Sequence, residues 1–264
     1  MRSPLSPLAP ARRRLVLIVL ACVVIAIVAV VGILVVHRLA GAGIAEQSRP
    51  GPVVLVPGYG GDVDSLGPWA QELRSEGRDV VVLQPTGGGT GDLQVQAARL
   101  GDLAERTLER TGARSVDLVG YSAGGVVLRI YLRDGGGASV VRRVLTVGSP
   151  HHGTEVATIA EQAAGGCPKA CEQLATGSEL LRGLAAGDET PAGPRWATVR
   201  TAEDETVTPV DSAELEGALN VKVQDLCPAA TTSHGALPSD PVVLAMLRSV
   251  LGRAAPTVPE DVTC

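Results

Sequence analysis

Val116-Asp117-Leu118-Val119-Gly120-Tyr121-Ser122-Ala123-Gly124-Gly125 is a short apolar run that ends in a serine between glycines. It has the form Gly-x-Ser-x-Gly, which is typical of a nucleophile elbow, a sharp turn from a strand into a helix that exposes the serine hydroxyl. Side chains two positions away on either side of the serine would collide with this turn, so both places need glycine. We therefore expect a strand that ends at an exposed Ser122.

The residues after the motif favour the elbow over its alternative, a glycine-rich turn. With 32 glycines in 264 residues, about 0.2 matches to so short a pattern arise by chance. However, apolar residues follow the serine at helical spacing, at Val126, Val127, Ile130 and Tyr131. This predicts a helix that ends at Asp134-Gly135-Gly136-Gly137.

The rest of the chain alternates short apolar strands with helices. Strands are predicted to start near Val53, Val80, Val116, Val144, Trp196 and Val221. An amphipathic helix is predicted over 92–111, capped by Asp92 and ended by Gly112. The last helix is predicted between Asp240, its cap, and Gly252. This alternation indicates an α/β fold, with about six mostly parallel strands and helices on both faces of the sheet.

One stretch, 155–194, has no clear strand periodicity and contains two cysteines. An excursion of this kind after a core strand can cover an active site as a mobile cap. It can equally be a surface insertion with no gating role. The sequence leaves both interpretations open.

The amino-terminal residues have the pattern of a membrane anchor. Residues 1–14 are basic, and the 22 residues from Leu15 to Val36 carry no charge. As a helix they would extend about 33 Å, enough to cross a hydrocarbon core. We expect a transmembrane signal-anchor over 15–36, a cytoplasmic segment over 1–14, and a linker over 37–51. The alternative is a secreted protein, cleaved near Ala42.

Charge and length limit the nature of the remaining domain, predicted over 52–264. After the five amino-terminal arginines, 18 basic residues face 28 acidic ones, which gives a net charge of −10. An acidic domain of this kind is a poor nucleic-acid binder. About 220 residues suit one globular domain with a substantial core, and we expect a monomer.

Four cysteines, Cys167, Cys171, Cys227 and Cys264, lie outside the apolar amino-terminal run. An even number in an exported domain predicts disulfides, and four thiols permit three pairings. Cys167 and Cys171 are close enough in sequence to bridge locally, which leaves Cys227 to hold the carboxy-terminal tail through Cys264. A metal site is the weaker interpretation, because no histidine pair or Cys-x-x-Cys accompanies them.

A serine nucleophile needs a neighbouring base, and the base needs a carboxylate to orient it. Of the four histidines, His37 lies at the end of the apolar run, while His151 and His152 follow the strand after Ser122. That is too early for the order Ser, Asp or Glu, His that accompanies this elbow. His234, in a loop between the last strand and the last helix, is the predicted base.

The acid should follow a strand and precede His234. Asp204 fits best, with Glu203, Glu205 and Asp211 as rivals in the same acidic loop. Asp225, at the end of the last predicted strand, fits a turn better.

The oxyanion of a tetrahedral intermediate requires donors that are fixed before reaction. With this elbow, one donor is the amide of the residue after the nucleophile, here Ala123, and the other comes from the loop after an early strand. Tyr59, in the glycine-rich loop after the first strand, is the predicted second donor.

Taken together, these segments resemble the α/β-hydrolase lipases of the bacterial secreted type, over roughly 52–251. The segments that carry the resemblance are Val56-Pro57-Gly58-Tyr59-Gly60-Gly61, Gly120-Tyr121-Ser122-Ala123-Gly124-Gly125, Ser149-Pro150-His151-His152-Gly153-Thr154, Glu203-Asp204 and Ser233-His234-Gly235. The resemblance implies an α/β-hydrolase fold, a triad of Ser122, Asp204 and His234, and oxyanion amides from Tyr59 and Ala123.

Two details qualify the resemblance. His151 and His152 match a segment that lies beside the active site in this family, where its histidines are structural. Pro57 stands where many relatives have histidine, which leaves the backbone donor intact and changes how the loop is supported.

The expected activity is hydrolysis of carboxylic esters, as in a lipase or esterase, through an acyl-enzyme and with no metal or organic cofactor. The expected partners are an ester or lipid substrate and, through the anchor, a membrane. Two alternatives stay open: an acyltransferase with the same triad, and a catalytically silent surface-binding module. The absence of phenylalanine predicts an acyl site built mainly from aliphatic side chains, of unspecified depth.

Overall fold

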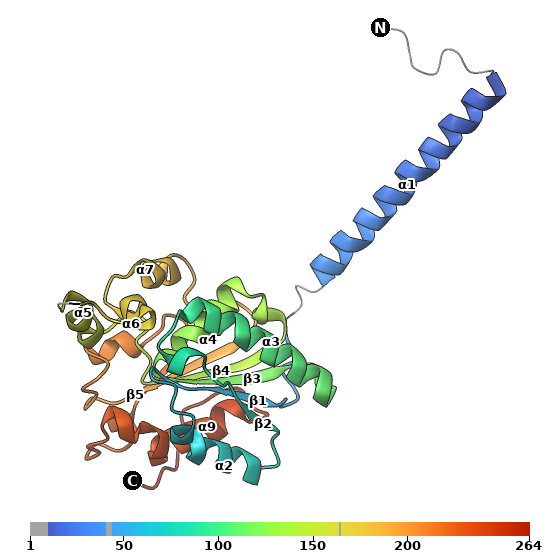
Figure 1. The fold of residues 1–264 in the computed structure, drawn as a ribbon. Helices are drawn as coiled ribbons and strands as arrows, with labels where there is room; N and C mark the ends of the chain where they lie inside the picture. Colours follow the sequence, from blue (N-terminus) through green and yellow to red (C-terminus); the bar gives the residue numbers. More distant parts are fainter. Residues whose placement is uncertain (1–9, 41–43, 164) are drawn as a thin grey trace. The chain divides into compact units, whose positions relative to one another are not determined.

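The structure is a computed structural model that describes residues 10–40, 44–163 and 165–264 (Figure 1). The chain forms two compact units, Met1–Gly43 and Ile44–Cys264. In the first unit, α1 spans Pro10–Ala40. The predicted cleavage site near Ala42 and the first nine residues of the predicted cytoplasmic segment lie outside the described residues.

The prediction of a membrane-spanning segment from Leu15 to Val36 is not supported. Within the described part of the chain, none of the helices combines the length and the apolar character needed to cross a membrane. The side chains of Leu15 and of residues 33–36, at the two ends of the predicted span, are outside the described part.

The second unit is built on a six-stranded sheet in the order β2-β1-β3-β4-β5-β6. Its strands are β1 (Val53–Val56), β2 (Val80–Val82), β3 (Val116–Tyr121), β4 (Val141–Val147), β5 (Arg195–Arg200) and β6 (Leu219–Lys222). All five neighbouring pairs are parallel. This confirms the predicted α/β fold and sheet.

The predicted last strand, Val221 to Gln224, is displaced. The strand begins two residues earlier, and Val223 already starts the short helix α8 (Val223–Leu226). The backbone amide of Lys222 donates to the Asp225 carboxylate at 3.2 Å, which fixes the amino end of this helix. Asp225 is therefore a helix cap, in keeping with the turn role that the sequence favours for it.

Helices cover both faces of the sheet (Figure 1). The principal ones are α2 (Gly67–Ser75), α3 (Leu93–Thr111), α4 (Ala123–Asp134) and α9 (Pro241–Leu251). Successive residues of β1 point to opposite faces: Val54 and Val56 pack with α3 and α4, while Val53 and Leu55 pack with α2 and α9. A strand buried on both faces has to be apolar at every position.

Local signals set the ends of the helices as predicted. The Asp92 carboxylate accepts from the Gln94 amide at 2.8 Å, and Gly112 ends α3 in a left-handed conformation, with φ of 66°. Asp240 accepts from the Val242 amide at 2.8 Å at the start of α9. These caps satisfy amides that have no partner inside the helix.

The excursion over 155–194 contains three helices, α5 (Glu155–Gln162), α6 (Lys169–Leu174) and α7 (Glu179–Ala185). All three are attached to the main body, because each contributes a buried side chain to the same apolar cluster as α3 and α4. Those side chains include Ala157 of α5, Ala170 and Leu174 of α6, and Leu181 and Leu184 of α7. In addition, the Gln173 side chain accepts from the Leu93 amide at 2.8 Å.

Arg129 makes a second attachment between this excursion and α4. Its guanidinium is buried and donates to the carbonyl oxygen of His151 at 2.9 Å and to that of Leu184 at 3.0 Å. The Glu189 carboxylate lies 3.5 Å away. Burial lowers the pKa of Arg129 to about 10, so the group is still charged at neutral pH.

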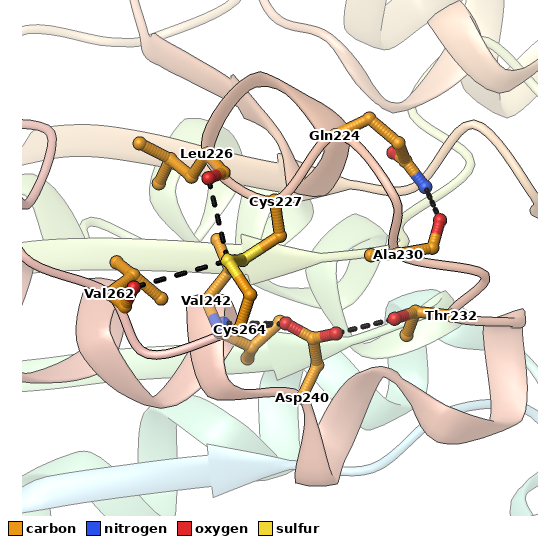
Figure 2. Close-up of a disulfide and its surroundings, with 10 residues drawn as sticks. Gln224, Leu226, Cys227, Ala230, Thr232, Asp240, Val242, Val262 and Cys264 are labelled. Atoms are coloured by element: carbon orange, nitrogen blue, oxygen red, sulfur yellow. Dashed lines mark hydrogen bonds between the residues drawn. A yellow bond between two sulfur atoms is a disulfide. The ribbon is translucent and has the colours of Figure 1, made fainter.

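Both predicted disulfides are present. Cys167 bonds to Cys171 at the start of α6, and Cys227 bonds to Cys264. Figure 2 shows the second bond, which holds the carboxy-terminal tail beside the loop that follows α8. Closing a loop of this length restricts the unfolded chain and stabilises the folded domain by a few kcal/mol, about 2 to 4.

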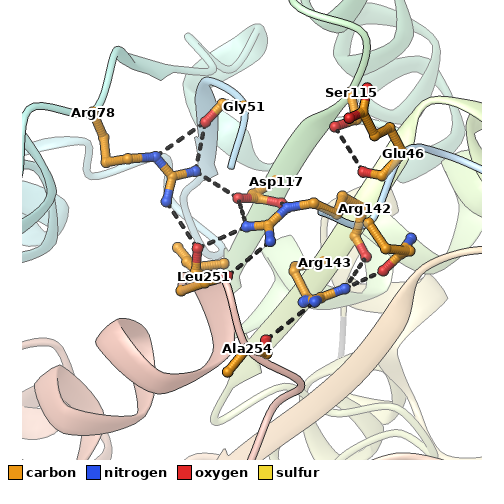
Figure 3. Close-up of polar contacts among 11 residues, drawn as sticks. Glu46, Gly51, Arg78, Ser115, Asp117, Arg142, Arg143, Leu251 and Ala254 are labelled. Atoms are coloured by element: carbon orange, nitrogen blue, oxygen red, sulfur yellow. Dashed lines mark hydrogen bonds and ion pairs between the residues drawn. The ribbon is translucent and has the colours of Figure 1, made fainter. Parts of the chain in front are cut away.

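A buried charge cluster lies at the amino end of β3 and β4 (Figure 3). The Asp117 carboxylate, fully buried, accepts from Arg142 at 2.6 and 2.9 Å and from Arg78 at 2.5 Å. The two guanidiniums also donate to the carbonyl oxygen of Leu251, at the end of α9. Burial raises the pKa of Asp117, whereas the two guanidiniums lower it. The buried carboxylate therefore needs the arginines as counter-charges, and the arginines need the carboxylate.

We predict that Asp117→Asn destabilises the domain by about 3 to 5 kcal/mol, because it leaves the fully buried guanidinium of Arg142 and the largely buried one of Arg78 without a counter-charge. The matched control is Asp79→Asn. Asp79 also binds an arginine in a bidentate manner, Arg110 at 2.6 and 2.7 Å, but both side chains are substantially exposed. This variant should lose less than about 1 kcal/mol. Urea unfolding with the disulfides intact measures both, and equal losses would contradict the prediction.

Candidate active site

The turn between β3 and α4 has the backbone strain expected of a nucleophile elbow. Ser122 has φ of 52° and ψ of −126°, and it is the one non-glycine residue with positive φ among the described residues. Two hydrogen bonds hold it there: its amide donates to the Val147 carbonyl oxygen at 2.8 Å, and its own carbonyl accepts from the Gly125 amide at 3.0 Å. Strain of this kind persists only where the surroundings enforce it.

Glycines on both sides of Ser122 make the turn possible. A Cβ on Gly120 would lie 2.6 Å from the Gly125 nitrogen, and a Cβ on Gly124 would lie 2.3 Å from the Val56 carbonyl oxygen. Both contacts are with backbone, which cannot move aside as a flexible side chain can. The requirement for two glycines that the motif predicts is therefore physical in this fold.

Ser122, His234 and Asp204 come together in a chain of hydrogen bonds. The distance from Ser122 Oγ to His234 Nε2 is 3.1 Å, and that from His234 Nδ1 to Asp204 Oδ2 is 2.8 Å. All three side chains are largely buried, and Ser122, which the motif predicts to be exposed, is only 9% exposed because the His234 ring lies against its hydroxyl. Their order along the chain and their separations are those of a serine nucleophile, a base and the acid that orients the base.

The backbone around Asp204 leaves one of its oxygens for the imidazole. Oδ1 accepts from the amides of Thr206 at 2.9 Å and Val207 at 2.7 Å. Oδ2 then faces His234 Nδ1. Because these bonds fix both oxygens of the carboxylate, they also fix the orientation of the ring.

The rival acids occupy other positions. The Glu205 carboxylate accepts from the backbone amide of His234 at 3.1 Å, not from its ring. Asp211 is an exposed partner of Arg200, at 3.3 Å. The Glu203 side chain is exposed, and its backbone forms an isolated bridge with Ser233. Of the four acids in this loop, Asp204 is the one beside the imidazole.

A second set of bonds joins the histidine loop to the sheet and to α9. Thr201 Oγ1, after β5, donates to the Thr232 carbonyl oxygen at 2.7 Å, and Thr232 Oγ1 donates to Asp240 at 2.5 Å. Asp240 also caps α9. The position of His234 thus depends on two elements that are distant in sequence.

His151 and His152 are separate from the series Ser122, His234 and Asp204. His151 is fully buried, with Nε2 2.9 Å from Thr146 Oγ1, and burial followed by the Arg129 charge lowers its pKa well below the usual value. It is therefore neutral at physiological pH. His152 is half-exposed, with Nε2 3.5 Å from Glu189. Neither ring has Ser122 as a hydrogen-bond partner.

The two predicted oxyanion donors lie next to the serine in different ways. Ala123 is the first residue of α4, where helix amides have no intrahelical partner. The loop after β1 approaches Ser122 at Gly58, where an added Cβ would lie 2.9 Å from Ser122 Cβ. Tyr59 follows Gly58 directly, and its own side chain is 44% exposed. The Tyr59 phenol therefore extends outward while its backbone belongs to the loop beside the serine.

Two residues that contact the site were missed by reasoning from the sequence. They are Glu205, which binds the His234 amide, and Tyr121, whose ring lies against the His234 ring. Glu205 appeared only as a rival for the acid, and Tyr121 only as the variable position of the motif. Their adjacency to Asp204 and Ser122 was the one signal available.

Comparison with known proteins agrees with this architecture. Residues 51–175 match the family model described as "alpha/beta hydrolase fold". Lipase B from Aspergillus fumigatus superposes with a TM-score of 0.70 at 19% identity, over 81% of this chain and 55% of that one. This chain therefore corresponds to little more than half of the Aspergillus protein.

Two bacterial structures are also similar. The mature form of lipase BlEst2 from Bacillus licheniformis has a TM-score of 0.61 at 21% identity, over 74% of this chain and 88% of that one. The lin2722 gene product of Listeria innocua has a TM-score of 0.54 at 15% identity, over 77% and 94%. Identities this low show a shared fold.

We predict that Gly124→Ala destabilises the domain by about 3 kcal/mol. The added methyl group would clash with the backbone of β1, which is packed on both faces and cannot move away. Gly183→Ala is the matched control. Gly183 lies within α7, is exposed, and has only the flexible end of Arg133 near its added Cβ. There the same change should stabilise the helix by about 0.5 to 1 kcal/mol. Thermal or urea unfolding checks both signs; a neutral Gly124→Ala would refute the close-approach argument.

Proposed function

We propose that this protein, which has the α/β-hydrolase fold, is a serine hydrolase that cleaves carboxylic esters through an acyl-enzyme. The observation that carries the proposal is the hydrogen-bonded series Ser122, His234 and Asp204 at a strained elbow, with separations of 3.1 and 2.8 Å. A serine hydroxyl becomes a nucleophile at neutral pH when a base of this kind removes its proton.

In the proposed mechanism, Ser122 Oγ attacks the ester carbonyl carbon while His234 Nε2 accepts its proton. The bond from Nδ1 to Asp204 selects the tautomer in which Nε2 is free to accept, and it stabilises the imidazolium that forms. The imidazolium then protonates the leaving alcohol. Water repeats the sequence on the acyl-enzyme and releases the acid.

The charge that develops on the carbonyl oxygen is assigned to the amides of Ala123 and Tyr59. Ala123 N lies at the amino end of α4, where the helix dipole also favours an anion. Gly58 supports the same arrangement, because its lack of a side chain allows the loop after β1 to approach Ser122. Pro57 leaves the amide of Tyr59 unchanged.

The substrate class rests on two lines of support. The superposed proteins from Aspergillus and Bacillus are lipases, and the chain offers almost entirely aliphatic side chains to surround an acyl group. An ester with an apolar acyl chain, such as a lipid ester, fits both. The two disulfides favour an oxidising, extracytoplasmic compartment.

We predict that Ser122→Ala reduces kcat/KM for p-nitrophenyl esters by at least about 1000-fold and abolishes labelling by a fluorophosphonate probe. The control is Ser115→Ala. Ser115 is also buried and directly precedes β3, at the end of that strand opposite to Ser122, so this variant should label and hydrolyse normally. A folded wild-type protein that never labels would instead indicate a catalytically silent module, and full hydrolysis by Ser122→Ala would refute the proposal.

A second prediction separates Asp204 from its rivals. Asp204→Asn should reduce kcat by about 10⁴-fold, because the amide can donate to Nδ1 and favour the wrong tautomer. Glu203→Gln changes the adjacent exposed acid in the same way and should retain activity. If the two variants are equally active, Asp204 is not the orienting acid.

The same experiments can distinguish hydrolysis from acyl transfer. Esters of graded chain length, assayed with and without added alcohols, report both the acyl preference and the fate of the acyl-enzyme. A product that is mainly the new ester at low alcohol concentration would indicate an acyltransferase. We expect the free acid to dominate.

A further inference from the structure

Tyr121 is the last residue of β3 and immediately precedes Ser122. In the sheet it pairs with Val147, the last residue of β4. Its side chain belongs to the apolar cluster on the face of the sheet covered by α2 and α9. Trp69 of α2, fully buried, meets the tyrosine ring edge to face, with a centroid separation of 6.0 Å and an interplanar angle of 89°. The Tyr121 ring is therefore held in place by Trp69 on the α2 side of the sheet.

From this position Tyr121 contacts His234 at two points. The two rings stack with a centroid separation of 5.2 Å and an angle of 27°. The phenol hydroxyl donates to the backbone carbonyl oxygen of His234 at 2.9 Å. One side chain thus touches both the imidazole face and the loop that carries it.

The other groups that face this pair are acidic or neutral. Asp204 binds the imidazole Nδ1, Glu205 binds the His234 amide, and Ser122 lies at Nε2. Burial raises the pKa of Tyr121, and the charges of Asp204, Glu205 and Asp62 raise it further. The phenol is therefore a neutral donor throughout the physiological range.

We propose that Tyr121 is a positioning residue for His234, which fixes the loop through its hydroxyl and favours the imidazolium through its ring. The inference rests on the proposed function. When His234 takes the proton of Ser122, its ring becomes a cation that lies against the electron-rich face of Tyr121, and such contacts stabilise a cation. The bond to the His234 carbonyl keeps Nε2 in line with Ser122 Oγ, where small displacements lower the rate strongly.

Two substitutions separate these contributions. Tyr121→Phe keeps the ring and removes the hydroxyl; we expect kcat/KM to fall about 3- to 10-fold, with the acid limb of its pH profile unmoved. Tyr121→Leu removes both, and kcat/KM should fall by about 10- to 100-fold. Without the ring the imidazolium loses stabilisation, so the pKa of His234 falls and the acid limb moves to lower pH.

The matched controls are Tyr131→Phe and Tyr131→Leu. Tyr131 is a buried tyrosine of α4 on the opposite face of the sheet, in the cluster formed with α3. These variants report the general effect of losing a tyrosine on stability. They should leave the acid limb of the pH profile in place even where they lower the unfolding temperature. If Tyr121 had only a structural role, its own variants would give this same result.

A readout independent of turnover completes the test. The His234 ring protons can be titrated by NMR in the free protein, with assignment from His234→Gln, in wild type and in Tyr121→Leu. A lower imidazole pKa in Tyr121→Leu supports the proposal. A His234 pKa that is unchanged or raised overturns the proposed stabilisation by the ring, and unchanged kcat/KM in Tyr121→Phe overturns the proposed role of the hydroxyl.

Failure of the proposed function looks different. If Ser122→Ala hydrolyses esters normally, the serine mechanism is wrong whatever Tyr121 does. Conversely, fluorophosphonate labelling that persists in Tyr121→Phe at a reduced rate shows an intact elbow with a less well-positioned base. The two inferences can therefore be rejected separately.

Discussion

The rest of the second unit depends on one close backbone approach, where α4 meets β1 and β3 at the elbow. At Gly124 there is no room for a methyl group beside Val56, and at Gly120 there is none beside α4 itself. This approach forces Ser122 into a positive φ and presents its hydroxyl at the carboxyl edge of the sheet. A packed interior tolerates such strain because the neighbouring strands and helices leave the chain no alternative.

Parallel strands give the elbow its partners. Since every neighbouring pair is parallel, the loops after β1, β3, β5 and β6 all begin at the same edge of the sheet. The loop after β1 contributes Gly58 and Tyr59, and the loop after β5 contributes Asp204. His234 comes from the segment that follows β6 and α8. Residues separated by more than a hundred positions thus meet within hydrogen-bond distance, and polar bonds between Thr201, Thr232 and Asp240 keep the loops in register.

The opposite edge of the sheet has a different role. Asp117 lies near the start of β3, the strand that Ser122 follows, and there a buried carboxylate joins two arginines to the end of α9 (Figure 3). The tail beyond α9 is then held by the Cys227–Cys264 bond. The amino end of the strands therefore carries a charge cluster that connects β3, β4 and α9. The carboxyl end carries the polar side chains of Ser122, Asp204 and His234 in hydrogen-bond contact.

The sequence by itself determined the features that follow from local backbone physics. The strand and helix alternation, the glycines around Ser122, the caps at Asp92 and Asp240, and the local Cys167–Cys171 pairing could all be predicted, because each depends on residues close in the chain. The prediction that Leu15 to Val36 spans a membrane is not supported by the described helices, and the last strand was placed two residues late. Only the tertiary structure decided that Asp204 faces the imidazole while Glu205 binds its backbone, that Arg129 ties the excursion to α4, and that Tyr121 lies against His234. These contacts join side chains far apart in sequence, and their geometry is set by how the whole sheet and its loops pack.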